Sequence, residues 1–327
     1  MMSSIPYSRY IVYPVTWYSF LIVLGASLAV FIASKAEKKS GLKKDTVIDL
    51  SLWLLPFGII GARAYYVVFS WNQFREHPLS VFRIWEGGLA IYGGIIAGLL
   101  VLLIFCKKRK IPPLQLCDII VPGLALAQSI GRWGNYFNIE AYGAAVSEPS
   151  FCFFPLSVEV PTPSGNIWHL AAFFYESVLD FCIFVFLITA GRRIRRKHGD
   201  IFFFYLVLYA AGRLIIEEIR VDSLYAASSV RISQLLSVLL CLFILVHSWL
   251  QTVRYQHHFS FPVFSLPLLS ILFSLFMAFS LIFPSVLPVM GLGQRLLFLF
   301  VYSLTVVCTY FISFASFGEG YNADYSA

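Results

Sequence analysis

The residues with the clearest chemical potential are three arginines embedded in apolar sequence. Arg63, Arg132 and Arg213 each lie within a hydrophobic stretch and not in a loop. Charged side chains at the depth of a membrane are costly and usually mark a functional site. Because a guanidinium presents a planar fork of donors that suits phosphate oxygens, these arginines indicate an anion site.

The segment 131–143, which reads GRWGNYFNIEAYG, surrounds Arg132 with further polar residues. On a helix, Asn135 lies close to one turn from Arg132, and the glycines allow a close backbone approach or a break in the helix. Glu140 could orient Arg132 or accept a proton. The alternative interpretation is a buried Arg–Glu pair that only fixes helix packing.

A second group of polar residues follows one face of a later helix. A polar stripe of this kind cannot face lipid, so it faces the interior of the bundle or water. An intrahelical ladder of salt bridges is the alternative interpretation. Four side chains share the stripe, within an arc of about 80°: Tyr209, Arg213, Glu217 and Arg220.

Paired glycines flank Tyr92 in the segment 87–98, which reads GGLAIYGGIIAG. Such glycines either expose backbone N–H groups to an anion or allow two helices to approach closely, and helix packing is the favoured interpretation. Tyr18 follows Trp17 in the first hydrophobic stretch, where an interfacial aromatic residue is expected.

These residues need a scaffold of membrane helices. Of the 327 residues, 59% are hydrophobic and 13% are charged, whereas soluble domains carry roughly 25% charged residues. A helix needs roughly 20 apolar residues to cross a hydrocarbon core, and stretches of about that length recur along the chain. We therefore predict an all-α polytopic integral membrane helix bundle with spans at 11–34, 46–70, 88–106, 113–137, 167–190, 201–219, 230–250, 262–283 and 296–316.

Lys and Arg are concentrated in alternate loops, chiefly 35–44, 107–110 and 192–197. Basic loops mark the cytoplasmic side, so the chain is expected to begin outside. The stretch 11–34 is then a first span and not a cleavable signal, because its positive flank follows it. The formal charge of +7 reflects this topology, with anionic lipid headgroups as a secondary contact. The basic runs lack the aromatic residues typical of nucleic-acid binding.

The longest connection outside the membrane, 138–168, contains four prolines and neither Lys nor Arg. It is long enough to form a small extracytoplasmic cap. The six cysteines show no metal-ligand spacing, and neither a metal nor a redox cofactor is predicted. No internal repeat is apparent, which disfavours an inverted-repeat transporter.

The run 131–143 resembles the signature of the prolipoprotein diacylglyceryl transferases of bacterial plasma membranes. Two positions depart from that family: Tyr92 stands where many relatives have His, and His169-Leu170-Ala171-Ala172 replaces a His-Pro-Thr motif. Further matches follow in order over about 10–250: Trp17-Tyr18, Gly61-Ala62-Arg63, Trp85-Glu86-Gly87-Gly88 through Gly93-Gly94, Phe174-Tyr175-Glu176, Tyr209 through Arg213 with Glu217 and Arg220, Asp222-Ser223-Leu224 and Arg231-Ile232-Ser233-Gln234.

The resemblance implies a membrane core of seven helices over 10–250, with 138–168 as its cap. Residues 259–317 then add a two-helix C-terminal hairpin, and 318–327 add a polar tail. The implied reaction moves the diacylglyceryl group of phosphatidylglycerol to the lipobox cysteine thiol of a preprolipoprotein, which forms a thioether and releases glycerol phosphate. The implied site faces the outer leaflet of a bacterial plasma (inner) membrane, where the signal peptide and membrane lipids are its partners.

Residue roles follow from the resemblance and from side-chain chemistry. Arg132 and Arg213 would hold the phosphate and stabilise the charge that grows on the leaving group. Their positive field would favour the thiolate of the substrate cysteine. Either Glu140, or Tyr92 through water, would take the thiol proton. The implied lipid-binding set is Arg132, Asn135, Tyr18, Arg63, Gly143, Tyr209, Glu217 and Arg220.

Three other functions fit parts of the sequence. An anion transporter or channel would also use intramembrane arginines, and a different lipid-phosphate enzyme could use a related bundle. A homologue that has lost activity would only bind lipid or partner proteins. A transporter forms no covalent product, and an inactive homologue binds phosphatidylglycerol without consuming it, so product analysis separates these functions.

Overall fold

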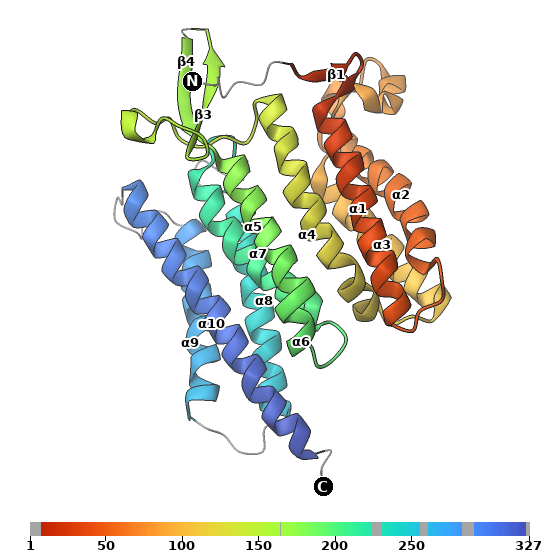
Figure 1. Cartoon of the computed structure of the whole chain (residues 1–327), viewed down its shortest axis with the longest axis vertical. Helices are drawn as coiled ribbons and strands as arrows, with labels where there is room; N and C mark the ends of the chain where they lie inside the picture. Colours follow the sequence, from red (N-terminus) through yellow and green to blue (C-terminus); the bar gives the residue numbers. More distant parts are fainter. Residues whose placement is uncertain (1–7, 164, 224–230, 256–260, 283–290, 325–327) are drawn as a thin grey trace. The chain divides into compact units, whose positions relative to one another are not determined.

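The computed structural model describes residues 8–163, 165–223, 231–255, 261–282 and 291–324. Its long helices occupy the predicted spans with shifted ends, and the predicted all-α polytopic membrane bundle is confirmed (Figure 1). The long helices are α1 (Trp17–Lys39), α2 (Thr46–Phe69), α3 (Ile91–Arg109), α4 (Pro113–Asn138), α5 (Ala172–Phe186), α7 (Asp200–Ile219), α8 (Ile232–Tyr255), α9 (Phe261–Ile282) and α10 (Leu292–Asp324).

Two helices begin later than predicted because the first residues of their apolar stretches pair as strands. The stretch 11–34 becomes helical only at Trp17, since β1 (Tyr10–Val12) and β2 (Val15–Thr16) form an antiparallel pair. The stretch 167–190 becomes helical at Ala172, since β4 (Gly165–Leu170) pairs with β3 (Ser157–Thr162). Hydropathy alone does not separate a short apolar strand from the first turn of a helix.

Within the described residues, seven helices are long and apolar enough to cross a membrane: α1, α2, α3, α4, α5 with its continuation through a π-helical turn to Ile194, α8 and α10. α7 differs because its second half carries Arg213, Glu217 and Glu218. More than half of its residues are buried, so neighbouring helices cover it. The chain is therefore a multi-pass membrane protein in which the charged half of α7 is covered by neighbouring helices.

The chain divides into two compact units, one made of Met1–Ala26 with Leu124–Ala327 and the other of Ser27–Gly123. In the unit Ser27–Gly123, α2 and α3 approach closely at glycines. A Cβ atom at Gly61 would lie 2.7 Å from the carbonyl oxygen of Gly93, closer than real side chains allow. This contact supports the helix-packing interpretation of the glycines around Tyr92.

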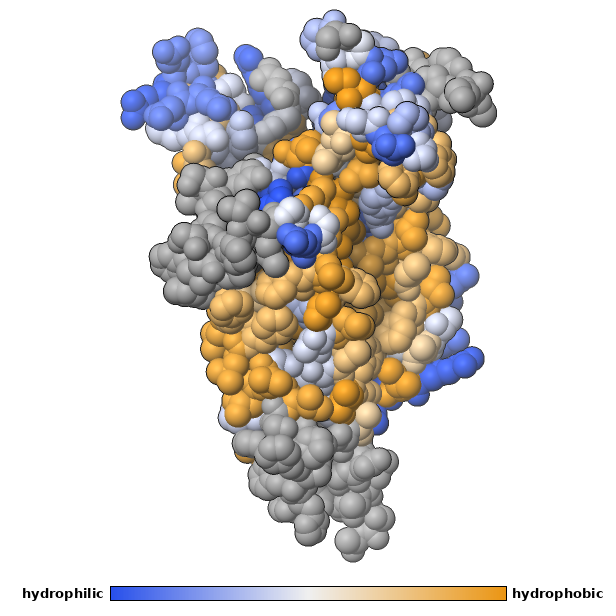
Figure 2. All heavy atoms as spheres, turned by 90° about the vertical axis from the view of Figure 1, so that its left-hand side faces the viewer, coloured by the Kyte–Doolittle hydropathy of each residue, from blue (hydrophilic) through white to orange (hydrophobic). Residues whose placement is uncertain are grey.

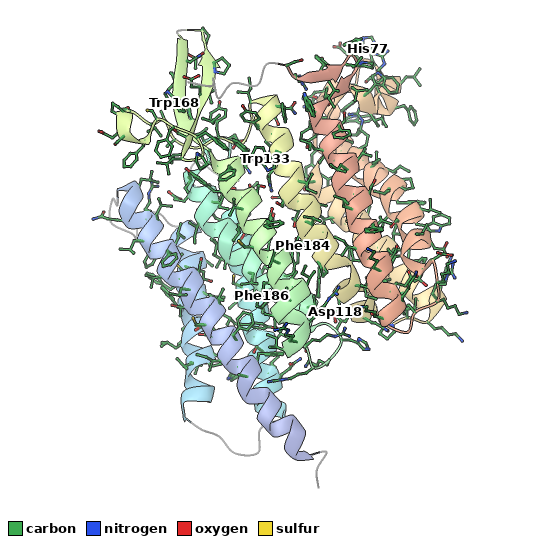
Figure 3. All side chains as sticks on the ribbon, in the orientation of Figure 1. His77, Asp118, Trp133, Trp168, Phe184 and Phe186 are labelled. Carbon is green, nitrogen blue, oxygen red and sulfur yellow. The ribbon has the colours of Figure 1, made fainter. Side chains whose placement is uncertain are left out.

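A small cap adjoins α4 and α5 in the other unit. It contains the hairpin β3–β4, whose register runs from Ser157 opposite Leu170 to Thr162 opposite Gly165. The ring of Trp133, on α4, lies 6.3 Å from that of Phe154 in the cap and 5.8 Å from that of Phe174 on α5 (Figure 3). Aromatic packing thus fixes the predicted cap segment to two of the helices.

The C-terminal helices α9 and α10 pack against α7 and α8 of the same unit. The Ser303 hydroxyl on α10 donates to the backbone carbonyl of Ala211 on α7 at 2.9 Å, and Phe311 stacks on Phe204 at 5.3 Å. Figure 2 shows a face that is largely apolar below a more polar upper end, as lipid contact requires. α10 continues to Asp324, so the segment 318–327, predicted as a polar tail, is helical up to that residue.

Candidate active site

Three helices of one unit, α4, α5 and α7, bring arginine and carboxylate side chains together. The Oε1 atom of Glu176, on α5, lies 2.5 Å from Arg132 Nη2 of α4 and 2.6 Å from Arg213 Nη1 of α7. The Glu176 side chain is 1% exposed. Two guanidinium groups from different helices therefore point at one buried oxygen atom.

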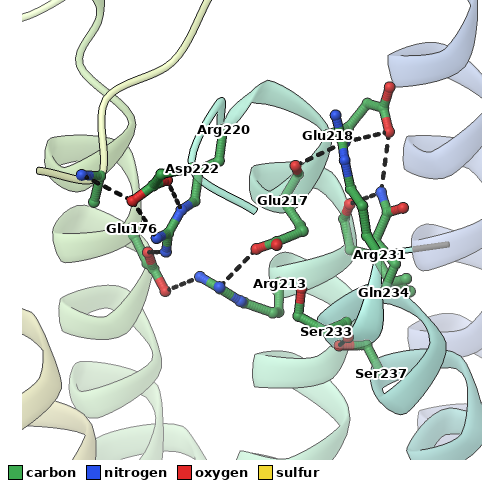
Figure 4. A network of polar contacts seen from close by, with 12 residues as sticks. Glu176, Arg213, Glu217, Glu218, Arg220, Asp222, Arg231, Ser233, Gln234 and Ser237 are labelled. Atoms are coloured by element: carbon green, nitrogen blue, oxygen red, sulfur yellow. Dashed lines mark hydrogen bonds and ion pairs between the residues drawn. The ribbon is translucent and has the colours of Figure 1, made fainter. Parts of the chain in front are cut away.

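The polar contacts continue along α7 and into the loop after it (Figure 4). Arg213 Nη2 lies 2.6 Å from Glu217 Oε2, and Arg220 Nη1 lies 3.7 Å from Glu176 Oε2. Arg220 also donates through Nε and Nη2 to the two oxygens of Asp222, each at 3.0 Å. We call these six residues the Glu176 cluster: Arg132, Glu176, Arg213, Glu217, Arg220 and Asp222.

The polar stripe predicted on the helix 201–219 faces this cluster. Arg213 and Glu217 form an i,i+4 ion pair, so the salt-bridge ladder considered as the alternative is present as part of the site. Tyr209 lies one turn before Arg213, within the electrostatic reach of Arg132. Its ring stacks on that of Tyr205 with a centroid distance of 5.6 Å.

The loop after α4 is fastened beside the cluster. Asp222 Oδ2 accepts a hydrogen bond from the N–H of Ala141 at 3.2 Å, and the N–H of Gly143 donates to the carbonyl of Leu170 at 2.7 Å. A Cβ atom at Gly143 would lie 2.7 Å from Ile219 Cγ2 and 2.8 Å from Leu170 Cβ. Gly143 therefore allows the close packing that positions the segment 131–143.

The charge of Asp222 holds this loop contact together. Burial raises the pKa of Asp222, but the hydrogen bond and the charge of Arg220 outweigh burial, so the pKa lies below its ordinary value. A carboxyl group with a lowered pKa stabilises the fold above its unfolded pKa, and this stabilisation is lost as the pH falls through the folded value. The loop contact is therefore present at neutral pH.

The arginines of the Glu176 cluster have donors left for a ligand. The side chains of Arg132, Arg213 and Arg220 are 21%, 15% and 13% exposed. Among the described residues, Arg132 is paired with Glu176 alone, through a single nitrogen, whereas a guanidinium carries five N–H donors. The partly exposed Arg132 guanidinium thus keeps donors that an incoming anion can use.

Glu176 was not among the site residues that the sequence indicated, although it lies in one of the matched motifs. Its signal is the same as that of the arginines, a charged residue within an apolar helix. The sequence suggests Glu140 to orient Arg132, but the carboxylate that contacts Arg132 is Glu176. Glu140 is exposed just beyond the end of α4, and with Asn135 it lines a small cavity under the cap.

Tyr18, on α1, packs against the segment that carries Arg132. A Cβ atom at Gly134 would lie 2.6 Å from Tyr18 Cδ2, so the glycine permits this contact. The neighbouring Trp17 stacks on Phe137 with a centroid distance of 5.0 Å. Tyr18 therefore packs on α4 at Gly134, which lies between Arg132 and Asn135 in the sequence.

Arg63 and Tyr92 belong to the unit Ser27–Gly123. Arg63 is 7% exposed, and its three guanidinium nitrogens all donate to backbone carbonyls. The acceptors are the carbonyl oxygens of Ser80, Val81, Arg83, Gly87 and Gly88. Arg63 thus stabilises the loop between α2 and α3. The ring of Tyr92, on α3, lies 6.5 Å from that of Tyr65. The predicted lipid-binding role of Arg63 and the predicted proton-transfer role of Tyr92 stay predictions.

The fold and the cluster place three arginines and three carboxylates inside a membrane bundle, and clustered guanidinium groups are the chemistry that suits phosphate oxygens. Comparison with known proteins identifies the family. Residues 7–250 match the model of the prolipoprotein diacylglyceryl transferase family. The phosphatidylglycerol–prolipoprotein diacylglyceryl transferase of Streptococcus agalactiae is 42% identical over 229 residues, which cover 70% of this chain and 88% of that protein.

Two further relatives carry the same name. The protein from Lactococcus lactis is 44% identical over 225 residues, covering 68% of this chain and 85% of its own length. The protein from Staphylococcus aureus is 40% identical over 236 residues, covering 70% and 82%. The chain therefore belongs to the prolipoprotein diacylglyceryl transferase family and is a transferase of a bacterial membrane, which confirms the resemblance carried by the sequence motifs.

Proposed function

We propose that this chain transfers the diacylglyceryl group of phosphatidylglycerol to the lipobox cysteine thiol of a preprolipoprotein. The products are a thioether-linked lipid and glycerol phosphate. The observation that carries the proposal is the convergence of Arg132 and Arg213 on one atom, Glu176 Oε1. Two converging guanidinium groups inside a membrane bundle suit the phosphate of an anionic lipid.

The reaction forms one C–S bond and breaks the C–O bond that joins the diacylglyceryl carbon to the phosphate. The electron pair of that bond leaves on a phosphate oxygen, so negative charge grows on the leaving group. Donors that hold the phosphate oxygens stabilise this charge in the transition state more than in the bound substrate. Arg132 and Arg213 take this role, and in a low-dielectric site each contact is stronger than in water.

The substrate thiol must also lose its proton, because the thiolate is the nucleophile. The positive field of the two arginines favours the thiolate. Glu140 and Tyr92 are the two candidate acceptors, and Glu140→Gln and Tyr92→Phe separate them. Only the variant that lacks the true proton acceptor should lose the inflection that the ionisation of this group produces in the pH–rate profile.

The remaining predicted residues bind or orient the lipid. We assign Asn135, Tyr18 and Tyr209 to contacts with the headgroup, since Tyr18 packs at Gly134 and Tyr209 precedes Arg213 by one turn. Glu217 and Arg220 keep Arg213 and Glu176 in position through their ion pairs. Gly143 and Arg63 act indirectly. Gly143 allows the loop after α4 to pack closely, and Arg63 holds the loop between α2 and α3 in place.

We propose that the N-terminus lies outside and that the site faces the outer leaflet. The basic segments 35–44, 107–110 and 192–197 favour this orientation, and an exported preprolipoprotein arrives on that side. A membrane-impermeant thiol reagent added to intact cells should label a cysteine placed at the cap residue Glu148 and not one placed at Lys108. The reverse labelling pattern would contradict the orientation.

The decisive experiment for the reaction is mass spectrometry of a lipobox peptide incubated with the purified protein and phosphatidylglycerol. The wild type should add the mass of a diacylglyceryl group to the cysteine, and Arg132→Ala should not. Arg109→Ala is the matched control, because Arg109 is 47% exposed, pairs with Asp49 and belongs to the unit Ser27–Gly123, which does not carry the cluster. A folded wild type that binds the lipid without adding this mass would contradict the proposal.

A further inference from the structure

A second buried carboxyl group adjoins Glu176 and has no role in the reaction described so far. Asp180 follows Glu176 by one turn of α5 and is 0% exposed. Among the described residues, neither oxygen of Asp180 has a hydrogen-bond partner, and the same holds for Glu176 Oε2. Because residues four apart are neighbours on a helix face, the carboxyl groups of Glu176 and Asp180 lie near each other.

Charged and titratable groups face Asp180 from three helices. They are Glu176 on α5 itself, Arg132 on α4, and Arg213, Tyr205 and Tyr209 on α7. The nearer arginine donors pair with Glu176, and in the described part of the chain no ion pair reaches Asp180. The Asp180 carboxyl group therefore lies in the electrostatic field of the Glu176 cluster, but in the described part of the chain it forms no ion pair with the cluster.

An ionised carboxylate that is buried without a hydrogen bond or an ion pair is costly. Protonation of Asp180 removes this cost, and the O–H of the neutral acid can donate one hydrogen bond. This donor has no acceptor among the described residues of the free protein.

Glu176 occupies the place that a phosphate needs. An anion held jointly by Arg132 and Arg213 must take the point where their Nη atoms converge, and Glu176 Oε1 fills that point. A displaced Glu176 carboxylate needs a new donor, because it stays buried. The O–H of Asp180, one turn away on the same helix, supplies a charge-assisted hydrogen bond.

We propose that Asp180 is a positioning residue that receives the Glu176 carboxylate when the lipid phosphate displaces it from Arg132 and Arg213. The inference rests on the phosphate site proposed above. No covalent bond changes in this step: the ion pairs pass from carboxylate to phosphate, and Asp180 keeps its proton while it donates to Glu176. Release of glycerol phosphate reverses the exchange.

Two isosteric variants test the exchange. Asp180→Asn keeps the size and a donor group, whereas Asp180→Leu keeps the size and removes the donor. Turnover of a lipobox peptide is measured in nanodiscs at increasing mole fractions of phosphatidylglycerol, together with thermal unfolding. Asp180→Asn should stay within about threefold of the wild-type KM for the lipid, and Asp180→Leu should raise that KM about ten- to a hundredfold.

The thermal measurement separates positioning from a merely structural role. Replacing an unpartnered buried polar group by an apolar isostere should leave Tm unchanged or raise it, so the Leu variant should lose lipid affinity without losing stability. A structural role would lower Tm and activity together. If Asp180→Leu does not fold, the smaller pair Asp180→Ser and Asp180→Ala makes the same comparison of donor against no donor.

An unchanged KM for the lipid in Asp180→Leu overturns the proposal. An Asp180→Asn variant as impaired as Asp180→Leu also overturns it, because an ionised carboxylate would then be required. Absence of turnover by the wild type would contradict the proposed function instead, so the two failures are distinguishable.

Discussion

Arg63 and Arg132 look alike in the sequence, but the partners of their guanidinium groups differ. Arg63 is 7% exposed, and its nitrogens donate to backbone carbonyls of the loop 80–88. Arg132 is 21% exposed and pairs through one nitrogen with Glu176. A carbonyl of a folded loop cannot be exchanged for a phosphate, but a carboxylate can, because it carries the same sign of charge. The type of partner therefore distinguishes the two arginines.

The largest effect is expected at the two arginines that converge on Glu176. Lys keeps the positive charge and loses the planar fork of donors, so Arg132→Lys or Arg213→Lys should lower kcat for transfer about 10²- to 10³-fold. The measurement is release of glycerol phosphate per folded protein. A Lys variant with the wild-type kcat would show that a point charge is sufficient.

Glu176→Gln is expected to have a smaller effect, and the first property to change should be the stability of the protein. Removing one partner of a buried ion pair leaves charge uncompensated, which costs about 3–5 kcal/mol. Phosphatidylglycerol should restore part of this loss, because its phosphate replaces the missing carboxylate and ligand binding stabilises the folded state. Thermal unfolding in nanodiscs of phosphatidylglycerol and of phosphatidylcholine measures the difference. If the anionic lipid stabilises wild type and variant equally, the phosphate does not take the place of Glu176.

Replacing Arg63 by Lys should affect stability more than activity, the opposite of what is expected for Arg132→Lys. An ammonium group cannot reach all the carbonyls that Arg63 contacts, so Arg63→Lys should lower the free energy of unfolding by about 1–3 kcal/mol. The specific activity of the folded fraction should stay within about threefold of wild type. A raised KM for phosphatidylglycerol at unchanged Tm would instead show that Arg63 binds lipid, as the sequence predicts, and would break the comparison.

The positions of the helices could be predicted from the sequence because hydropathy reports on burial in lipid directly. The starts of α1 and α5 were wrong, since strand pairing of 10–16 and 157–170 depends on contacts that hydropathy does not report. The predicted span 296–316 ends close to the apolar part of α10 at Ala315. The helix itself continues to Asp324, because a polar composition does not by itself end a helix.

The candidate site could be predicted in part. The arginines and the stripe on α7 follow from the high cost of charge in an apolar helix. The pairing of Arg132 with Glu176 does not, because it joins α4 to α5 across 44 positions of the chain. The sequence suggested Glu140 instead, because Glu140 lies in the same polar segment as Arg132 and local patterns favour partners near in sequence. The distinction between Arg63 and Arg132 likewise depends on tertiary contacts.

The smallest effect is expected where the C-terminal hairpin meets α7. Glu218 Oε1 lies 3.0 Å from Arg295 Nη1 of α10, while Glu218 Oε2 accepts from Arg231 and Gln234 at 2.7 and 3.1 Å (Figure 4). Arg295 is 51% exposed, and exposed ion pairs are worth about 0–1 kcal/mol. Arg295→Gln should therefore leave kcat within about twofold of wild type.

Ser303→Ala tests the buried contact of the same hairpin. Loss of its hydrogen bond to the Ala211 carbonyl should cost about 1 kcal/mol of stability, with no separate loss of activity in the folded fraction. The family match ends at residue 250, before α9 and α10 begin, so the hairpin is expected to support α7 without taking part in the chemistry. If Arg295→Gln or Ser303→Ala lowers kcat as far as Arg132→Lys at unchanged Tm, then helices outside the family match set the geometry of Arg213. The contacts between α10 and α7 would in that case be functional and not only supporting.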